Sequence, residues 1–297
     1  MCILIMTTRQ TGGHDFRTLL KLYRVTTIIT FTPNRLHFEQ SVLMLSHGKH
    51  VMCEKTITSN QLELNKLVEI ADKNHVVLLE AMRSVFDPGF FVIQENLHRL
   101  GTIRRVSFQF CKYSSRYDNF KNGVIENSFN PSFSNGALMD IGVYCIHPLV
   151  KLFGLPNKII SDAIFLHNGV DGAGTILASY EQMQAELIYS KISNSYIPSQ
   201  IQGEDGTLVI EEIPNPCKIT FYGKNGETEV LMSREPDSNM IYEIEAWIGQ
   251  IKGDRDWHES MKSSCMELQM MDEVRSQLSI KFPADEEKQW EKLNLKG

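Results

Sequence analysis

The sequence has no long apolar run and no excess of positive charge. None of its hydrophobic stretches approaches the ~20 residues that a helix needs to cross a bilayer, and its first residues lack the basic stretch of a signal peptide. Its net charge of -6 argues against non-specific binding to DNA or RNA. These absences predict a cytoplasmic protein with no membrane and no nucleic-acid partner, whose partner is a small molecule.

Several motifs with known chemistry are also missing. The six cysteines are scattered without a C-x-x-C pair, which favours reduced thiols, and no histidine or cysteine cluster has metal-ligand spacing. There is no G-x-S-x-G elbow of a serine hydrolase. The one G-x-G, Gly172-Ala173-Gly174, lacks the third glycine of a dinucleotide fingerprint. We therefore predict no metal site.

Residues 25–82 alternate between short apolar runs and helical patterns. The predicted strands are 25–31, 50–55 and 76–81, and the helices between them are 36–47 and the stretch that follows Thr58. Thr58 with a Gln three residues later matches a capping box. The order strand, helix, strand, helix, strand predicts a parallel sheet. Residues 1–15 show no clear period, and a short helix is predicted at 16–23.

Beyond residue 85 the pattern changes to strands joined by short turns. The predicted strands are 103–111, 158–167, 174–180, 184–192, 198–210, 217–222 and 228–232, and the predicted helices are 88–100, 137–153 and two final stretches. Turn signals such as Asn168-Gly169 and Asn225-Gly226 separate the strands, which is typical of an antiparallel sheet. The sequence thus predicts a partial doubly wound domain, 1–84, and an α+β domain, 85–297, whose last helices are free to pack back on the first.

Polar residues follow two strands of the predicted parallel sheet. Thr32-Pro33-Asn34 and His37 come after the first strand, and Glu54-Lys55 ends the second. The carboxyl ends of such strands border the ligand crevice of a parallel sheet. The alternatives are an ordinary turn for Pro33-Asn34 and a surface ion pair for Glu54-Lys55. The residues alone leave both interpretations open.

A second set of polar residues lies on the helix predicted at 137–153. Asp140 and Tyr144 are four residues apart, so both side chains project from one face among apolar neighbours. Buried polar side chains need partners, so the two either satisfy each other or meet a ligand. Pro148 conflicts with the carbonyl of Tyr144, which predicts a kink or irregularity beside Tyr144. His147 is more typical of a packed or hydrogen-bonded histidine than of a ligand.

Taken together, these segments resemble the Gfo/Idh/MocA family of nicotinamide-dependent oxidoreductases. The resemblance rests on the ordered segments 32–37, 48–55 and 136–144, with 80–83, 203–208 and 271–275 as further segments. It implies an α/β fold, with an incomplete Rossmann-type parallel sheet followed by an α+β domain with an open, mainly antiparallel sheet. It also implies NAD or NADP as cofactor and a sugar, polyol or related hydroxy or carbonyl compound as substrate. The assembly it implies is a homo-oligomer, a dimer or tetramer, formed through the C-terminal sheet.

The resemblance further implies roles for individual residues. Lys55, Tyr144 and Asp140 are the implied catalytic residues: Tyr144 exchanges the substrate's hydroxyl proton beside the Lys55 ammonium, and Asp140 orients the substrate or the pair. The implied cofactor-binding residues are Thr32, Pro33, Asn34, His37, Glu54 and Lys55. The candidates for substrate binding are Arg83, Arg116 and His147. Tyrosine at 144, where many members carry histidine, is similar to the glucose-fructose oxidoreductase and dihydrodiol dehydrogenase branch.

Two features depart from the family pattern. Thr56 stands where the family usually has proline, so the loop at Lys55 loses a fixed φ. About 31 residues precede Thr32, and one βαβ unit already needs ~30. We therefore expect a chain shortened at its N-terminus, without the first strand, the glycine-rich loop and the second strand. The alternatives to a working oxidoreductase are a non-catalytic remnant or oligomerising scaffold without dinucleotide binding, and an enzyme that forms a Schiff base through Lys55.

Overall fold

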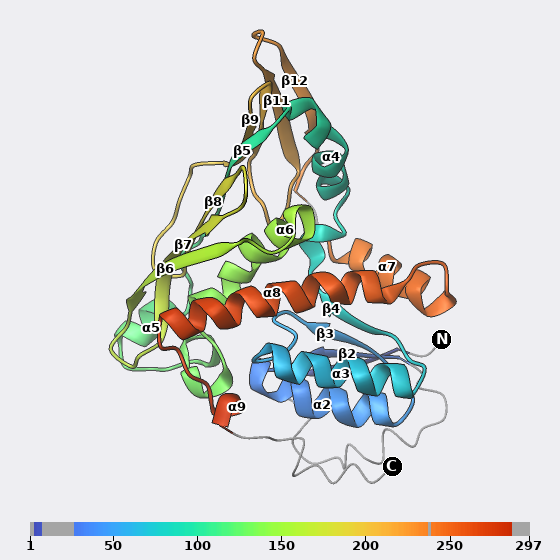
Figure 1. The fold of residues 1–297 in the computed structure, drawn as a ribbon. Coiled ribbons are helices and arrows are strands. Elements are labelled where there is room, and N and C mark those ends of the chain that lie inside the picture. Colours follow the sequence, from blue (N-terminus) through green and yellow to red (C-terminus); the bar gives the residue numbers. More distant parts are fainter. Residues whose placement is uncertain (1–2, 8–26, 237–238, 287–297) are drawn as a thin grey trace.

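The first layer of the molecule is a small parallel sheet. The computed structural model describes residues 3–7, 27–236 and 239–286. The strands of this sheet, in their spatial order, are β1 (Ile3–Thr7), β2 (Thr27–Phe31), β3 (His50–Glu54) and β4 (Leu78–Ala81). Each neighbouring pair is parallel, which confirms the predicted Rossmann-type sheet (Figure 1).

A strand precedes β2, contrary to the sequence prediction. β1 pairs with β2 from Ile3 opposite Thr27 to Thr7 opposite Phe31. The run Ile-Leu-Ile-Met-Thr contains good strand formers, but its 5 residues are too few for a period to emerge from sequence alone. The prediction that the first strand is absent is therefore wrong. The turn at 11–13 and the helix predicted at 16–23 lie outside the described residues.

The small sheet is buried on both faces, which explains its uninterrupted apolar strands. One set of strand side chains joins the main core together with α2 (Asn34–Ser46) and α3 (Gln61–Lys73); these are Ile28, Val51 and Leu78. The alternate set packs with Trp247 of α7 (Met240–Lys252); these are Ile29, Met52 and Leu79. The strand ends are thus held between helices, and their carboxyl tips carry the loops discussed below.

Helix α3 begins later than the capping pattern predicts. Its N-cap is Asn60, whose side chain accepts a hydrogen bond from Glu63 N at 3.0 Å, while Glu63 accepts one from Ser59 N at 3.0 Å. The predicted capping role of Thr58 is wrong, because Thr58 Oγ1 donates to the carbonyl of Asn60 at 2.9 Å. Asparagine caps as well as threonine does, so the sequence holds two overlapping capping patterns and the later one forms.

The second layer is a sheet of eight strands in the order β12-β11-β10-β9-β5-β8-β7-β6. The strands are β5 (Ile103–Cys111), β6 (Lys158–Phe165), β7 (Asp171–Ser179), β8 (Gln184–Ser190), β9 (Ser199–Gly203), β10 (Gly206–Ile210), β11 (Lys218–Gly223) and β12 (Thr228–Ser233). β5 and β8 pair in parallel, and the other neighbours are antiparallel. The predicted open, mainly antiparallel sheet is confirmed.

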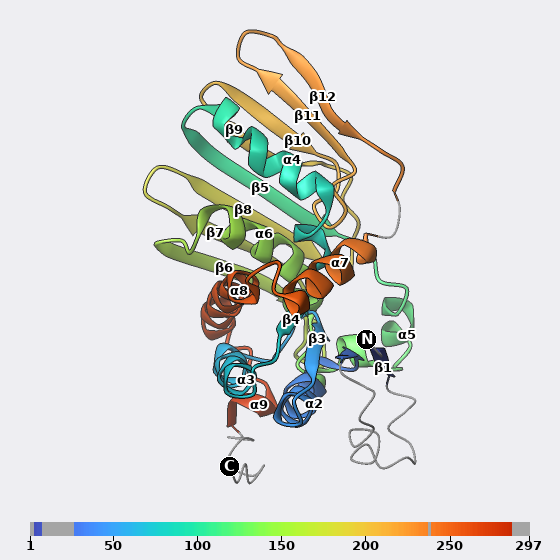
Figure 2. The same cartoon turned by 90° about the vertical axis from the view of Figure 1, so that its right-hand side faces the viewer.

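One face of the large sheet carries helices and the other is open. Figure 2 shows α4 (Pro88–Asn96) and α6 (Val143–Phe153) on the covered face. The connections contain α5 (Tyr117–Lys121) and the 3₁₀ turns Arg83–Val85, Leu97–Leu100, Asn127–Phe129 and Pro131–Phe133. On the open face, Ile160 lies opposite Leu177, and these side chains are 54% and 38% exposed.

Helix α8 (Trp257–Gln277) joins the two layers. It packs against α3 and β4 of the small sheet and against α6 and β6 of the large one, and it crosses the middle of the molecule in Figure 1. The short α9 (Pro283–Glu286) follows it. Although α8 has 21 residues, neither it nor any other helix in the described ranges is long and apolar enough to cross a membrane.

Arg275 connects α8 to the loop before α3. Its side chain is 5% exposed, donates to Ser59 O at 3.0 Å and to Asp272 Oδ1 at 2.9 Å, and pairs with Asp285. Arg275→Met leaves these acceptors without their donor, so we expect the free energy of unfolding to fall by about 2–4 kcal/mol. Urea unfolding followed by circular dichroism measures this loss.

A matched control for this change is Arg104→Met, which breaks the exposed pair with Glu204. Surface pairs contribute roughly 0–1 kcal/mol, so this variant is expected to stay close to the wild type. Equal losses in the two variants would contradict the role given to Arg275.

Candidate functional site

A wide helical turn presents the first residue of the site. Leu138–Gly142 forms a π-helical turn that runs directly into α6. Asp171 Oδ2 accepts a hydrogen bond from Leu138 N at 2.6 Å, and a Cβ at Gly136 would come within 1.8 Å of Asp171 Oδ1. Glycine is therefore required at 136 for Asp171 to reach the turn. The predicted irregularity is present, just before Tyr144, and it carries the Asp140 side chain.

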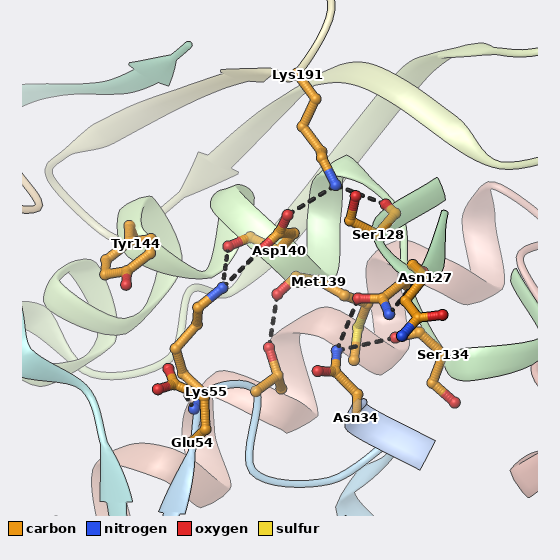
Figure 3. A network of polar contacts seen from close by, with 12 residues as sticks. Asn34, Glu54, Lys55, Asn127, Ser128, Ser134, Met139, Asp140, Tyr144 and Lys191 are labelled. Carbon is orange, nitrogen blue, oxygen red and sulfur yellow. Dashed lines mark hydrogen bonds and ion pairs between the residues drawn. The ribbon is translucent and has the colours of Figure 1, made fainter. Parts of the chain in front are cut away.

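Lys55 reaches Asp140 from the end of β3. Its Nζ lies 2.7 Å from Asp140 Oδ1 and 2.5 Å from the Asp140 carbonyl oxygen, and its side chain is 13% exposed (Figure 3). The next residue, Thr56, donates from Oγ1 to Met139 O at 2.7 Å. The side chains of Lys55 and Thr56 thus both bind the π turn. The interpretation of Glu54-Lys55 as a surface ion pair does not describe this arrangement.

A second lysine holds the other oxygen of Asp140. Lys191, immediately after β8, places its Nζ 2.7 Å from Asp140 Oδ2 and 2.6 Å from Ser128 O. The same Nζ lies 4.5 Å from the centre of the Phe129 ring. Its side chain is 3% exposed. Asp140 therefore bridges Lys55 and Lys191, and the idea that Asp140 and Tyr144 satisfy each other is replaced by this bridge (Figure 3).

The three charges shift one another's proton affinities. Burial raises the pKa of Asp140, but the charges of Lys55 and Lys191 outweigh it and hold that pKa well below its usual range. Burial lowers the pKa of Lys55, and Asp140 reverses this effect, so the pKa ends above its usual value. Burial prevails at Lys191, whose pKa is lowered. At neutral pH, Asp140 is accordingly a carboxylate and Lys55 an ammonium.

Tyr144 lies beside these charges and is 8% exposed. Lys55 Nζ is 5.3 Å and Arg83 Cζ 5.5 Å from the centre of its ring, and Arg83 Nε is 3.5 Å from its hydroxyl. Phe110 of β5 meets the ring edge to face at 5.5 Å. The phenol is therefore oriented by packing and lies among cations, an arrangement suited to a group that exchanges a proton.

A hollow of about 330 Å³ adjoins this corner. Arg83 and Phe110, which both contact Tyr144, form part of its wall. The rest of the wall is mostly polar and consists of Gln109, Cys111, Lys112, Asn194, Ser195, Tyr196, Ile197, Glu211, Glu212 and Pro214. Its size and its mixture of donors and acceptors suit a small hydroxylated molecule.

The residues at the end of β2 mainly hold the surrounding loops. Asn34 Nδ2 donates to Ser134 O at 3.0 Å and to Asn135 Oδ1 at 3.3 Å. His37 is fully buried and its ring nitrogens lie 2.9 Å from Thr56 O and 2.8 Å from Thr32 O. These contacts connect the loops after β2 and β3 to each other and to the segment before the π turn. Pro33 is the N-cap residue of α2.

Two of the predicted substrate residues lie elsewhere. His147 is 3% exposed, with Nδ1 2.5 Å from Glu267 Oε2 and 3.8 Å from Glu80 Oε2. Glu80 Oε1 in turn accepts a hydrogen bond from Ile57 N at 3.0 Å. The network of His147, Glu267 and Glu80 therefore binds the loop that follows Lys55. Arg116 is 55% exposed and pairs with Glu126. Arg83 alone of the three predicted substrate residues contacts Tyr144.

Sequence reasoning missed Lys191, although a signal was present. In the predicted strand 184–192, the residues at alternate positions 185, 187, 189 and 191 are Ala, Leu, Tyr and Lys. Alternate residues of a strand share a face, and the first three are buried. A lysine that continues a buried face needs an anionic partner. That reasoning predicts the burial of Lys191 but not that its partner is Asp140.

Two protein-family models match the chain. The model described as "Oxidoreductase family, NAD-binding Rossmann fold" matches residues 8–82, and the "GFO/IDH/MocA C-terminal domain" matches residues 96–209. The chain is also 44% identical over 257 residues to scyllo-inositol 2-dehydrogenase (NADP(+)) IolU of Bacillus subtilis (strain 168), covering 86% of this chain and 78% of that protein. The chain belongs to the Gfo/Idh/MocA family of oxidoreductases.

More distant relatives and a solved structure are also similar to this chain. The chain is 28% identical over 264 residues to trans-1,2-dihydrobenzene-1,2-diol dehydrogenase of Xenopus laevis, covering 84% of this chain and 77% of the relative. The structure of KijD10, a 3-ketoreductase from Actinomadura kijaniata, matches with a TM-score of 0.78 at 20% identity, covering 91% of this chain and 84% of that one. The latter is a likeness of fold. The predicted family, its enzyme class and its nicotinamide cofactor are confirmed.

Membership in the Gfo/Idh/MocA family implies a bound nicotinamide cofactor, and the strand ends fit its nicotinamide and ribose end. Glu54 is partly exposed at the tip of β3, with Oε1 accepting a hydrogen bond from Lys55 N at 3.1 Å. A carboxylate is a strong acceptor for ribose hydroxyls, and it stands beside the Lys55 ammonium. The sequence contains no G-x-G-x-x-G, and residues 8–26, between β1 and β2, lie outside the described residues.

Asp171 gives the site a measurable pH dependence. Burial raises its pKa to about 6. Because the folded chain then binds this proton more tightly than the unfolded chain, the associated stability is present at low pH and is lost as the pH rises through about 6. Asp171→Asn abolishes this titration and keeps an oxygen that can accept from Leu138 N.

We therefore expect the wild type to gain about 1–2 kcal/mol of unfolding free energy relative to Asp171→Asn between about pH 8 and about pH 5. Urea unfolding of both proteins at the two pH values measures the gain. A difference that stays constant across this range would contradict the buried titration of Asp171.

Proposed function

We propose that this protein transfers a hydride between NAD or NADP and a carbinol carbon of a sugar, polyol or related hydroxy or carbonyl compound. The observation that carries the proposal is the meeting of Lys55, Asp140 and Tyr144 at the carboxyl ends of the parallel strands. The relatives named as dehydrogenases of scyllo-inositol and of a dihydrodiol act on cyclic compounds with neighbouring hydroxyl groups. A compound of that kind is accordingly the substrate that we propose.

Each residue of the cluster has a distinct task in this proposal. Tyr144 takes the hydroxyl proton during oxidation and returns it during reduction, as a positioned acid and base. Lys55, a fixed ammonium, stabilises negative charge on the phenol oxygen or the substrate oxygen as it develops. Asp140 holds that ammonium in place. Bound nicotinamide supplies the hydride acceptor or donor.

The remaining predicted residues divide into those that bind the cofactor and those that bind the substrate. Glu54 and Lys55 would hold the nicotinamide and ribose end, and the backbone of Thr32, Pro33 and Asn34 would border it. The substrate extends into the hollow next to Arg83, whose Nη1 donates to Asn239 Oδ1 at 2.7 Å. We propose no substrate contact for Arg116 or His147, because Arg116 is exposed and paired with Glu126, and His147 is buried and bound to Glu267.

The contacts of Lys55 argue against the Schiff-base alternative. A nucleophilic lysine must be a free amine, whereas this one is an ammonium paired with Asp140 at 2.7 Å, with a raised pKa. The non-catalytic remnant remains the alternative from a different class. Cofactor binding distinguishes the oxidoreductase from the remnant, because a remnant binds neither NADH nor NADPH.

The decisive experiment compares three variants with the wild type. Tyr144→Phe removes the proton-exchanging hydroxyl and Lys55→Met removes the ammonium, and we expect each to lower kcat by roughly 10²–10⁴-fold with a polyol substrate. The control is Tyr113→Phe, which removes an exposed hydroxyl that bonds Asp118 at 2.8 Å. Initial rates of NAD(P)H formation with a panel of inositols and sugars provide the measurement.

Cofactor binding is measured separately by fluorescence titration with NADH and NADPH. We expect saturable binding by the wild type and by Tyr144→Phe. Full turnover in Tyr144→Phe would refute the proposed chemistry, and a wild type that binds neither cofactor would favour the remnant.

We further propose that the protein is cytoplasmic and that each chain has two domains, with a boundary near residue 84.

We also propose a homo-oligomer that assembles through the open face of the large sheet. Exposed apolar side chains on neighbouring strands of that face support the interface, among them Ile160, Ile164 and Leu177. A charge there is costly to bury, so Ile164→Glu is expected to convert the oligomer to monomer. Light scattering after gel filtration gives the mass. Leu62→Glu, at an exposed site on α3, is the control that should leave it unchanged.

A further inference from the structure

Lys191 is buried, and no step of the proposed reaction uses it. Its side chain is 3% exposed, yet it carries an ammonium group at the end of the large sheet. An ammonium group is costly to bury unless anions and dipoles surround it. Here its Nζ has three neighbours: the Asp140 carboxylate at 2.7 Å, the Ser128 carbonyl at 2.6 Å and the face of the Phe129 ring. The site thus provides this lysine with a complete set of partners.

Lys191 shares one of these partners, Asp140, with Lys55. Asp140 has two carboxylate oxygens, of which Oδ1 faces Lys55 and Oδ2 faces Lys191, each at 2.7 Å. The carboxylate therefore cannot rotate about its terminal bond without exchanging or losing a partner. Figure 3 shows the two lysines approaching Asp140 from opposite sides, Lys55 from the small sheet and Lys191 from the large one.

We propose that Lys191 is a positioning residue for hydride transfer: by fixing Oδ2 of Asp140, it keeps Oδ1 on Lys55 and so holds the Lys55 ammonium beside Tyr144. This inference rests on the proposed function of Lys55 and Tyr144. Lys191 touches neither the phenol nor the hollow wall, so it acts through Asp140. Its positive charge also favours the ionised form of that carboxylate.

The kinetic test uses Lys191→Met and Lys191→Gln, with Lys66→Met on the exposed surface of α3 as the matched control. Loss of the Lys191 charge is expected to lower kcat by roughly 10- to 100-fold, because misplaced catalytic groups cost that much. The KM for the cofactor should stay unchanged in both Lys191 variants, and Lys66→Met should keep the kcat and the KM of the wild type.

A second measurement is independent of turnover. Asp140→Asn leaves two buried ammonium groups facing each other, so it should be strongly destabilised. Adding Lys191→Met to Asp140→Asn removes that repulsion, and the double variant should be more stable than Asp140→Asn alone in urea unfolding. Independent effects of the two changes would overturn the proposal.

The outcomes separate the two claims. An active wild type whose kcat is unaffected by Lys191→Met would make Lys191 a structural residue and would overturn the positioning role. A wild type that oxidises no polyol with either cofactor would instead defeat the proposed function itself, and the stability cycle would still report whether Lys191 and Asp140 are coupled.

Discussion

The Asp140 carboxylate receives one lysine from each sheet, and the geometry of the site depends on this shared ion. Lys55 directly follows β3 of the small sheet, and Lys191 directly follows β8 of the large one. Each lysine alone would be a buried cation and Asp140 alone a half-buried anion, so each is stabilised there by the others. The ion cluster therefore forms only when the two sheets are docked, and the docking in turn fixes which oxygen each lysine meets.

Uncharged contacts hold the same junction in register. Thr56 donates to Met139 O, Asn34 to Ser134 O, and Ser59 Oγ to Ser134 Oγ at 2.7 Å. They connect Thr56 and Ser59, in the loop after β3, and Asn34, at the start of α2, to Ser134 before the π turn and Met139 within it. They are short-range and directional, whereas the ion cluster is strong but less directional. Together they define both the distance and the orientation of Lys55 relative to Tyr144.

The features that the sequence predicts are those carried by local patterns. The alternation of apolar runs over residues 25–82 determines the parallel sheet, and a spacing of four places Asp140 and Tyr144 on one face. The features that it does not predict depend on contacts between distant segments. Lys191 lies 51 positions after its partner Asp140 (191 minus 140), and nothing local selects that carboxylate over another. The sequence does not predict β1, because the strand is too short to show a period. It predicts the wrong start for α3, because Asn60 and Thr58 both suit the N-cap position. His147 has the residue type of a ligand, yet its partners Glu80 and Glu267 come from β4 and α8.

Helix α8 is in contact with both layers, and this has a thermodynamic consequence. It packs on α3 and β4 below and on α6 and β6 above, so the sheets cannot separate without exposing its apolar side chains as well as the ion cluster. Opening of the site and melting of α8 are therefore linked equilibria. A substitution in the buried face of α8 changes the fraction of molecules in which Lys55 and Tyr144 are correctly placed. The residues of this face consequently contribute to the population of competent enzyme, although α8 itself supplies no group to the reaction.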